Sequence, residues 1–230
     1  MRSKKTTHPA NSTAIQLTIA AIGRHTLPQG SEPVGALVDR YKPIRQAFKL
    51  SYPGRIDDDI FLLDLANISA ERMFAAVDSN RAYLRQWLPW LDLNTAVEDS
   101  EAFIRRERKR AEDGVGLIRA IEYRSELCGI VGFNWIDPVN RACEIGYWLS
   151  EDRQGRGIMT RSVQAFIEYA FATRALNRIT IPVAVENDKS RAIPEGLGFA
   201  QEGIRREAEW LYDHYVDHVV YALLRKNWDE

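Results

Sequence analysis

Cysteine is scarce in this chain, which also has neither a long apolar run nor a strong net charge. Only Cys128 and Cys143 occur among the 230 residues, so a disulfide-stabilised scaffold is excluded and both thiols are expected reduced in the core. No apolar run approaches the roughly 18 residues of a membrane-spanning helix, so no membrane span is expected. The formal charge is −1, and the eight Lys and Arg residues among the first 50 are too scattered to indicate a nucleic-acid-binding surface.

Familiar nucleotide and metal motifs are missing too. The sequence contains no GxxxxGK(S/T) loop, and the glycine pair at 155 and 157 is not followed by the third glycine of GxGxxG. His214 and His218 stand four residues apart, but their surroundings alternate as in a strand and supply no recognisable ligand set. We therefore expect no metal site, with one histidine in a turn and the other exposed.

The first 57 residues differ in composition from the rest. They hold five of the nine prolines and little sustained periodicity, so residues 1–57 are expected to form a partly disordered extension before a single domain at 58–230. Lys4 and Lys5, followed by the run AIQLTIAAIG, resemble a secretion signal only weakly, because Gln16 and Thr18 interrupt that run. A cytoplasmic protein is expected.

From residue 59 onward, hydrophobic periodicity predicts strands and helices that together define an α/β (α+β) fold. Ser69 is expected to open one helix, Thr95 and Glu98 to form the capping box of another, and Ser190 to open a short one. Strands are expected at 60–65, 116–123, 127–136, 142–149, 178–185 and twice within 206–224, with a helix at 158–174. Proline has no N–H to donate to a neighbouring strand, so Pro182 is unexpected inside a strand. It fits only if that strand lies at the edge of the sheet or if the backbone nitrogen of Pro182 faces a gap.

Residues 151–160, EDRQGRGIMT, join the strand that ends in EIGYWL to a helix. Gly155 and Gly157 remove the Cβ atoms that would keep a ligand from the backbone, so consecutive N–H groups can converge on an anion. A helix that begins at Ile158 adds unpaired N–H groups and the positive end of its dipole. The pattern indicates a phosphate-binding turn, although a lone GxG pair is as typical of an ordinary tight turn.

At this turn and at six further segments the chain resembles the GNAT superfamily of N-acetyltransferases. Gln154 and Gly157 match the first and fourth positions of the family's phosphate turn, Gln/Arg-x-x-Gly-x-Gly/Ala, and Met159 departs from the sixth. The other segments are NRAYLRQWLPW (80–90), ACEIGYWL (142–149), LNRITI (176–181), NDKS (187–190), GLGFAQEG (196–203) and YVDHVVYALL (215–224). The resemblance covers about residues 59–230 and is strongest to the branch that acetylates alanine or serine at ribosomal-protein N-termini.

The resemblance implies a GNAT fold, in which a mixed, mostly antiparallel seven-stranded sheet with flanking helices has splayed fourth and fifth strands. Acetyl-CoA would enter that splay, which would also account for Pro182. The main chain of Leu149 would pair with the cosubstrate, Asn187 would contact it, and the backbone N–H of Tyr147 would stabilise the oxyanion. The phosphate groups would bind the turn formed by Gln154, Gly155, Arg156, Gly157, Ile158 and Met159. No metal is implied.

Acetylation of an amine also needs a base and an acid. Glu144, a carboxylate among the apolar residues of a strand, is the candidate base, acting through a water; alternatively it faces the open side of the strand or pairs with an arginine. The tyrosine that protonates the leaving thiolate in many GNAT enzymes falls at Pro194 here, so the resemblance points to Ser190 instead. The same serine is a suitable N-cap for the helix that follows.

The acceptor is expected to be a primary amine. An α-amino group, with a pKa of about 7.7–8.0, supplies the neutral nucleophile more readily than a lysine near 10.4, which favours the N-terminus of a peptide or protein. By resemblance Trp87 and Trp90 border the acceptor groove, and the charge run at 105–110 is expected on a solvated helix face. A small-molecule amine acetyltransferase, a non-catalytic acyl-CoA sensor and a homodimer all remain open.

Overall fold

A computed structural model describes residues 54–228, and all of them fall within one compact unit. The expected extension at 1–57 therefore lies almost entirely outside the described residues. Its last part contacts the first strand, β1 (Ile60–Asp64): the N–H of Leu62 donates to the Gly54 carbonyl at 2.8 Å, and the Asp57 carboxylate accepts from the N–H of Ile60 at 2.9 Å. Structured contacts thus extend ahead of the predicted boundary at residue 58.

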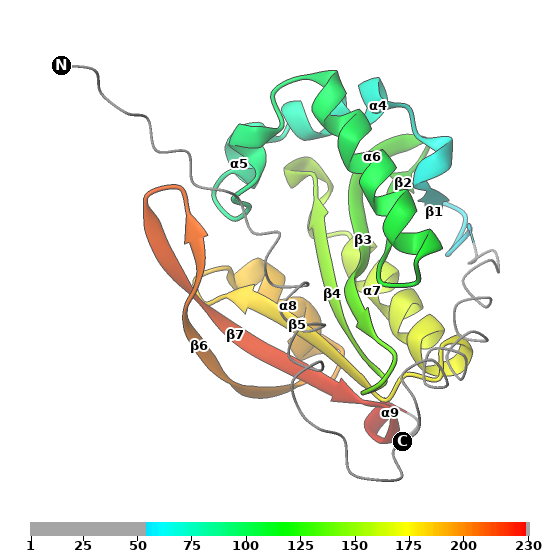
Figure 1. Cartoon of the computed structure of the whole chain (residues 1–230), viewed down its shortest axis with the longest axis vertical. Helices are drawn as coiled ribbons and strands as arrows, with labels where there is room; N and C mark the ends of the chain where they lie inside the picture. Colours follow the sequence, from blue (N-terminus) through cyan, green and yellow to red (C-terminus); the bar gives the residue numbers. More distant parts are fainter. Residues whose placement is uncertain (1–53, 229–230) are drawn as a thin grey trace, which may run out of the picture. The chain divides into compact units, whose positions relative to one another are not determined.

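Within the described residues, seven strands form one mixed sheet with helices on both faces (Figure 1). After β1 come β2 (Leu117–Tyr123), β3 (Glu126–Asp137), β4 (Ala142–Leu149), β5 (Arg178–Ala184), β6 (Ala200–Leu211) and β7 (His214–Leu224). The helices are α4 (Ala70–Asp78), α5 (Arg81–Leu84), α6 (Val97–Glu112), α7 (Ile158–Glu168), α8 (Asp188–Gly196) and α9 (Arg225–Trp228). Shorter turns are the 3₁₀ segments η1 (Leu65–Asn67), η2 (Leu91–Leu93) and η3 (Glu151–Arg153) and the π-helical η4 (Tyr169–Thr173).

The strand order is β1-β2-β3-β4-β5-β7-β6, and every neighbouring pair is antiparallel except β4 with β5. The connection between these two parallel strands contains α7, as a crossover connection requires. The predicted fold class, a mixed and mostly antiparallel seven-stranded sheet, is confirmed. The start predicted for the sixth strand is wrong: β6 begins at Ala200, not 206, because Ala200 already pairs with Ala222 of β7.

Alternation along β4 sends successive side chains into two separate cores. Cys143 and Ile145 belong to the core that contains the buried face of α7, whereas Trp148 belongs to the core of α4 and α6. Side chains two residues apart share a face of a strand, so Glu144 lies on the same face as Trp148. Both cysteines are free and buried in the first core, and burial raises the pKa of Cys128 to about 12.

The helix starts partly follow the sequence predictions. Ser69 caps α4 as predicted. The predicted capping box of α6 is wrong, because Asp99, not Glu98, reaches back to accept from the N–H groups of Thr95 and Ala96 at 2.9 and 3.0 Å. The helix expected at 158–174 is α-helical to residue 168 and continues as the π-helical η4. No helix among the described residues is long and apolar enough to cross a membrane.

β4 and β5 begin side by side and then diverge (Figure 1). Their pairing ends where Glu144 lies opposite Thr180. Pro182 lies beyond this last pair, on a strand enclosed between β4 and β7, so the edge-strand explanation of this proline is wrong. Its missing N–H interrupts no hydrogen bond to β4, because no ladder exists on that side. The expected splay between the fourth and fifth strands is therefore present.

Candidate functional site

A cavity of about 1330 Å³ opens where β4 and β5 separate. Its wall is formed by β4, β5, the turn before α7, the start of α8, the α5–η2 segment, α6 and the β6–β7 hairpin. Every site residue predicted from the sequence lies on this wall except Arg156, which is exposed. These residues are Trp87, Trp90, Glu144, Tyr147, Leu149, Gln154, Gly155, Gly157, Ile158, Met159, Asn187 and Ser190.

The main chain of β4 presents N–H groups to this cavity. The N–H of Ser150 donates to the Cys128 carbonyl at 2.7 Å, and the register places Leu149 opposite Gly129 of β3. Along a strand, N–H groups that point to one neighbouring strand alternate with N–H groups that point away from it. Because the N–H of Ser150 points to β3, the N–H groups of Tyr147 and Leu149 face away from β3. Because β5 no longer pairs with β4 at these positions, both donors point into the splay.

Two glycines in the left-handed region shape the turn before α7. Gly155 and Gly157 have φ angles of 70° and 68°. A Cβ at Gly155 would meet no atom within 4 Å, so the backbone conformation, and not a lack of space, requires glycine there. The N–H groups of residues 155–160 donate to no described group, and the first bond of the helix runs from Arg161 to Gly157. The turn can therefore donate several hydrogen bonds to one anion.

Met159 does not obstruct this turn, although it departs from the family pattern. Its side chain is 5% exposed and that of Ile158 is 1% exposed, because both pack into the core beneath α7. The main chain of the two residues is thus what reaches the cavity. A large side chain at the sixth position of the pattern is accommodated by pointing it inward.

Side chains from three segments hold the turn in place. Gln154 Oε1 accepts from Lys189 Nζ at 3.0 Å, which ties the turn to α8. Arg161 donates to the carbonyls of Arg156 and Gly157 at 3.2 and 3.3 Å, and it also pairs with Asp57. The sequence-based set did not include Lys189. It lies inside the NDKS segment, but only the fold brings its positive charge beside Gln154.

A pair of hydroxyl groups lies beside the splay. The predicted capping role of Ser190 is wrong, because α8 begins at Asp188 and Asn187 is its N-cap, with Oδ1 accepting from the Ser190 N–H at 3.1 Å. Ser190 Oγ is therefore able to donate to the Tyr147 hydroxyl at 3.3 Å, and that hydroxyl donates to the Ser190 carbonyl at 3.0 Å. Burial raises the pKa of Tyr147, so its phenol keeps its proton.

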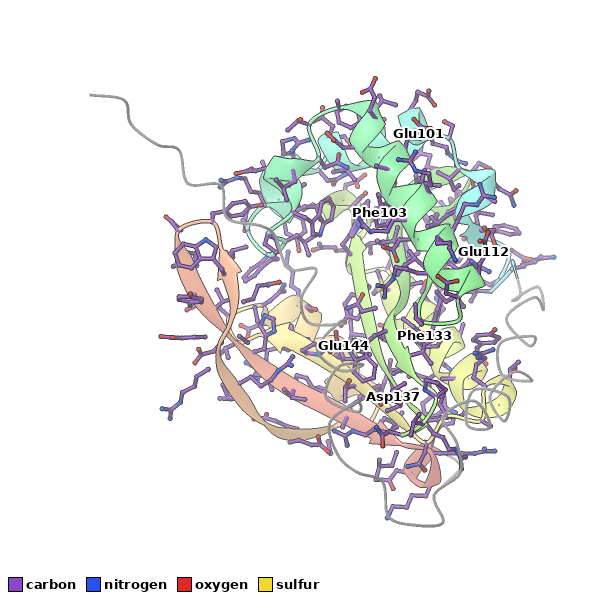
Figure 2. The ribbon with its side chains drawn as sticks, in the orientation of Figure 1. Glu101, Phe103, Glu112, Phe133, Asp137 and Glu144 are labelled. Atoms are coloured by element: carbon purple, nitrogen blue, oxygen red, sulfur yellow. The ribbon has the colours of Figure 1, made fainter. Side chains whose placement is uncertain are left out.

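Glu144 lies on β4 at the last pair before β5 separates (Figure 2). Its Oε1 accepts from Asn134 Nδ2 at 3.2 Å. Asn134 lies at a β-bulge, where β3 has one residue more than β4. Its side chain fits there because Gly146 has no Cβ; a Cβ at that position would lie 2.5 Å from Asn134 Nδ2. Glu144 forms no ion pair with any described residue, so pairing with an arginine does not explain it. A half-buried carboxylate that has no ion-pair partner among the described residues thus faces the cavity.

Trp87 and Trp90 are half-buried on the cavity wall between α5 and η2. The turn of the β6–β7 hairpin contacts this segment. The Tyr212 hydroxyl donates to the Leu88 carbonyl at 2.6 Å, and the Arg85 guanidinium lies 3.7 Å from the centroid of the Tyr212 ring. The hydrogen bond and the cation–π contact join the hairpin to the segment that carries both tryptophans.

One sequence prediction about a histidine is wrong, and one about a charge run holds except at a single residue. His218, expected to be exposed, has 14% side-chain exposure, lines the cavity and lies 3.5 Å from Glu209. On α6, most of the charge run at 105–110 is exposed as expected, but Glu107 is 9% exposed and pairs with Arg106 and Arg110 at 2.9 and 3.1 Å. These residues were missed because sequence periodicity does not reveal which distant strands and helices meet.

Within residues 54–228, no group of three or more His, Cys, Asp and Glu side chains is placed to hold a metal ion.

Comparison with known protein families and sequences gives a consistent result. Residues 61–200 match the family model of the acetyltransferase (GNAT) domain. The chain is 34% identical over 177 residues to the putative ribosomal N-acetyltransferase YdaF of Bacillus subtilis (strain 168). That alignment covers 76% of this chain and 96% of the relative.

Solved structures agree. The microcin C7 self-immunity acetyltransferase MccE, in complex with acetyl-CoA and AMP, superposes with a TM-score of 0.72 at 29% identity, covering 76% of this chain and 97% of that one. RimL, a ribosomal L7/L12 alpha-N-protein acetyltransferase in complex with coenzyme A, superposes with a TM-score of 0.70 at 30% identity, covering 75% and 97%. With its splayed sheet, its N–H-lined turn and these matches, the chain belongs to the GNAT family of N-acetyltransferases.

Proposed function

We propose that this protein transfers the acetyl group of acetyl-CoA to the α-amino group of a protein or peptide N-terminus, of the ribosomal-protein type. One observation carries the proposal: a single cavity joins the N–H groups of the turn at 155–160, the outward N–H groups of β4 and the carboxylate of Glu144. The names of YdaF and RimL, which refer to ribosomal acceptors, support this choice of acceptor. A ribosomal acceptor would place the reaction in the cytoplasm.

The turn and the splay suit different parts of acetyl-CoA. The free N–H groups of residues 155–160 and the positive end of α7 bind the pyrophosphate, and Lys189 adds a nearby positive charge. The pantetheine arm lies between β4 and β5, where its amides pair with the outward main chain of Leu149. Asn187, at the start of α8, lines the same space. The thioester thereby lies beside the N–H of Tyr147.

Each chemical step then has a candidate group. Glu144, through a water, takes a proton from the acceptor ammonium, and the neutral nitrogen forms a bond to the thioester carbon. The carbonyl oxygen gains negative charge and accepts from the Tyr147 N–H. When the C=O bond re-forms, the C–S bond breaks and the thiolate takes a proton from the Ser190 hydroxyl, which the Tyr147 hydroxyl orients. A proton lost by the nitrogen restores the Ser190 hydroxyl by way of solvent.

Mass spectrometry of a mixed acceptor panel tests this proposal. The protein and acetyl-CoA are incubated with peptides that carry free or blocked N-termini, lysine peptides and small amines. We expect the acetyl label on free N-termini, because the α-amino group has a lower pKa than the lysine side chain and is more often neutral near pH 7. Label on small amines alone would keep the acetyltransferase and overturn the N-terminal acceptor. Binding of acetyl-CoA without label on any amine would favour the non-catalytic sensor.

The hydrogen bond between the hairpin and the tryptophan segment is expected to influence acceptor binding. Tyr212→Phe removes the bond to the Leu88 carbonyl and keeps the ring against Arg85. We expect the KM for the acceptor to rise by about fivefold, the equivalent of roughly 1 kcal/mol for one hydrogen bond, with kcat and the Kd for acetyl-CoA unchanged. Steady-state kinetics measures these values, and Tyr215→Phe, on a 57% exposed tyrosine, is the matched control. An unchanged acceptor KM in Tyr212→Phe would contradict the prediction.

A further inference from the structure

A small recess adjoins the main cavity at the base of the splay. It has a volume of about 170 Å³ and shares Glu144, Pro182 and Arg205 with the main cavity. Its full lining is Trp135, Glu144, Thr180, Pro182, Arg205 and Val220. One carboxylate and one guanidinium group therefore border the same recess, next to the position proposed for acetyl transfer.

Arg205 differs from the other cations on the cavity wall. Arg106 and Arg110 pair with Glu107, and Lys189 donates to Gln154. Arg205 forms no hydrogen bond or ion pair with any described residue.

The backbone directs Arg205 toward the cavity. On β6 it lies opposite His218 of β7 in the strand register, and cross-strand partners project to the same face of a sheet. His218 lines the cavity and contacts Glu209, so the face that carries Arg205 is the cavity face. Arg205 is exposed, and its guanidinium has five donors for an oxygen-rich anion. A positive charge that has no partner among residues 54–228 is thus available to a ligand.

We propose that Arg205 binds a carboxylate of the acceptor and selects N-termini whose second residue has an acidic side chain. This inference rests on the proposed N-terminal acetylation. The acceptor amine lies at Glu144, and an extended peptide advances about 3.3 Å per residue, so the side chain of the second residue can reach the other side of the recess. A guanidinium and a carboxylate form charge-assisted, often paired hydrogen bonds, whereas an isosteric amide accepts a weaker bond from Arg205.

Two peptides that differ in one group test the proposal. One begins Ser-Asp and the other Ser-Asn, with the remaining residues identical, and kcat/KM is measured for each. For the wild-type protein we expect a ratio of about five in favour of the acidic peptide, the upper range for an ion pair in contact with water. Arg205→Gln is expected to bring the ratio to about one, mainly through the KM of the acidic peptide, and Arg205→Glu to favour a Ser-Lys peptide instead.

Arg206 provides the matched control. It is also an exposed arginine of β6, but it lines neither the cavity nor the recess, so Arg206→Gln is expected to keep the wild-type ratio. Raising the salt concentration is expected to lower the wild-type ratio and not that of Arg205→Gln. Equal wild-type rates for the two peptides, or a preference that survives in Arg205→Gln, would overturn the role of Arg205 and leave N-terminal acetylation intact. Acetylation of neither peptide would overturn both proposals.

Discussion

Glu144→Gln is expected to lower kcat by at least about a hundredfold, the usual loss when a general base is removed. The amide has nearly the shape of the carboxylate and can still accept from Asn134, but it cannot take a proton from the acceptor ammonium. The deficit is expected to shrink above about pH 8, because the α-amino group then supplies its own neutral form. Measuring rates between about pH 6 and 9.5 tests this expectation, and calorimetry is expected to give an unchanged Kd for acetyl-CoA.

Two other carboxylates sharpen this experiment. Glu101 on α6 (Figure 2) has a 66% exposed side chain that lies 3.8 Å from Arg105, so Glu101→Gln is expected to behave like the wild type. Glu209 is the informative comparison, because it lies on the cavity wall beside His218. A large, pH-dependent loss in Glu209→Gln together with near-normal activity in Glu144→Gln would assign the base to Glu209 instead.

Gly157→Ala is expected to weaken acetyl-CoA binding by about tenfold. The φ angle of 68° at this position costs an L-residue about 1–2 kcal/mol, and about 1.4 kcal/mol corresponds to tenfold in affinity. Without ligand, the backbone of the alanine variant is expected to leave the left-handed conformation at residue 157. Binding of acetyl-CoA must then restore that conformation before the N–H groups converge on the phosphates, and the free energy needed weakens the binding. Calorimetry at a temperature well below the Tm of the variant measures the Kd directly. The double change with Gly155→Ala is expected to have a larger effect.

Gly196 supplies the control for these substitutions. It is the last residue of α8, its φ lies outside the left-handed region, and a Cβ there would meet no atom within 4 Å. Gly196→Ala is therefore expected to bind acetyl-CoA like the wild type and to fold normally. If a folded Gly157→Ala variant also binds with wild-type affinity, the turn before α7 is an ordinary tight turn and the phosphates bind elsewhere.

Local sequence signals predicted much of the fold. A short, mostly apolar run placed β4 at 142–149, as observed, and Ser69 marked the start of α4, because these features depend on residues close together in the chain. The glycine pair at 155 and 157 marked a turn that only a backbone with positive φ can form. The capping of α8 was not predictable at this level. Asn187 and Ser190 are both good N-cap residues, and they lie about one helical turn apart. Local sequence does not indicate which of the two starts the helix takes.

By itself the sequence determined the order of the elements, the glycine positions in the turn before α7 and the resemblance to GNAT enzymes, since each depends on neighbouring residues in a short segment. Only the tertiary structure decided which side chains share the cavity. The β5–β7 and β7–β6 pairings bring Arg205, Glu209 and His218 to the splay, and strand pairing between distant segments leaves no signal in local periodicity. Divergence of β4 from β5 likewise determines that the Tyr147 N–H remains unpaired and faces the splay.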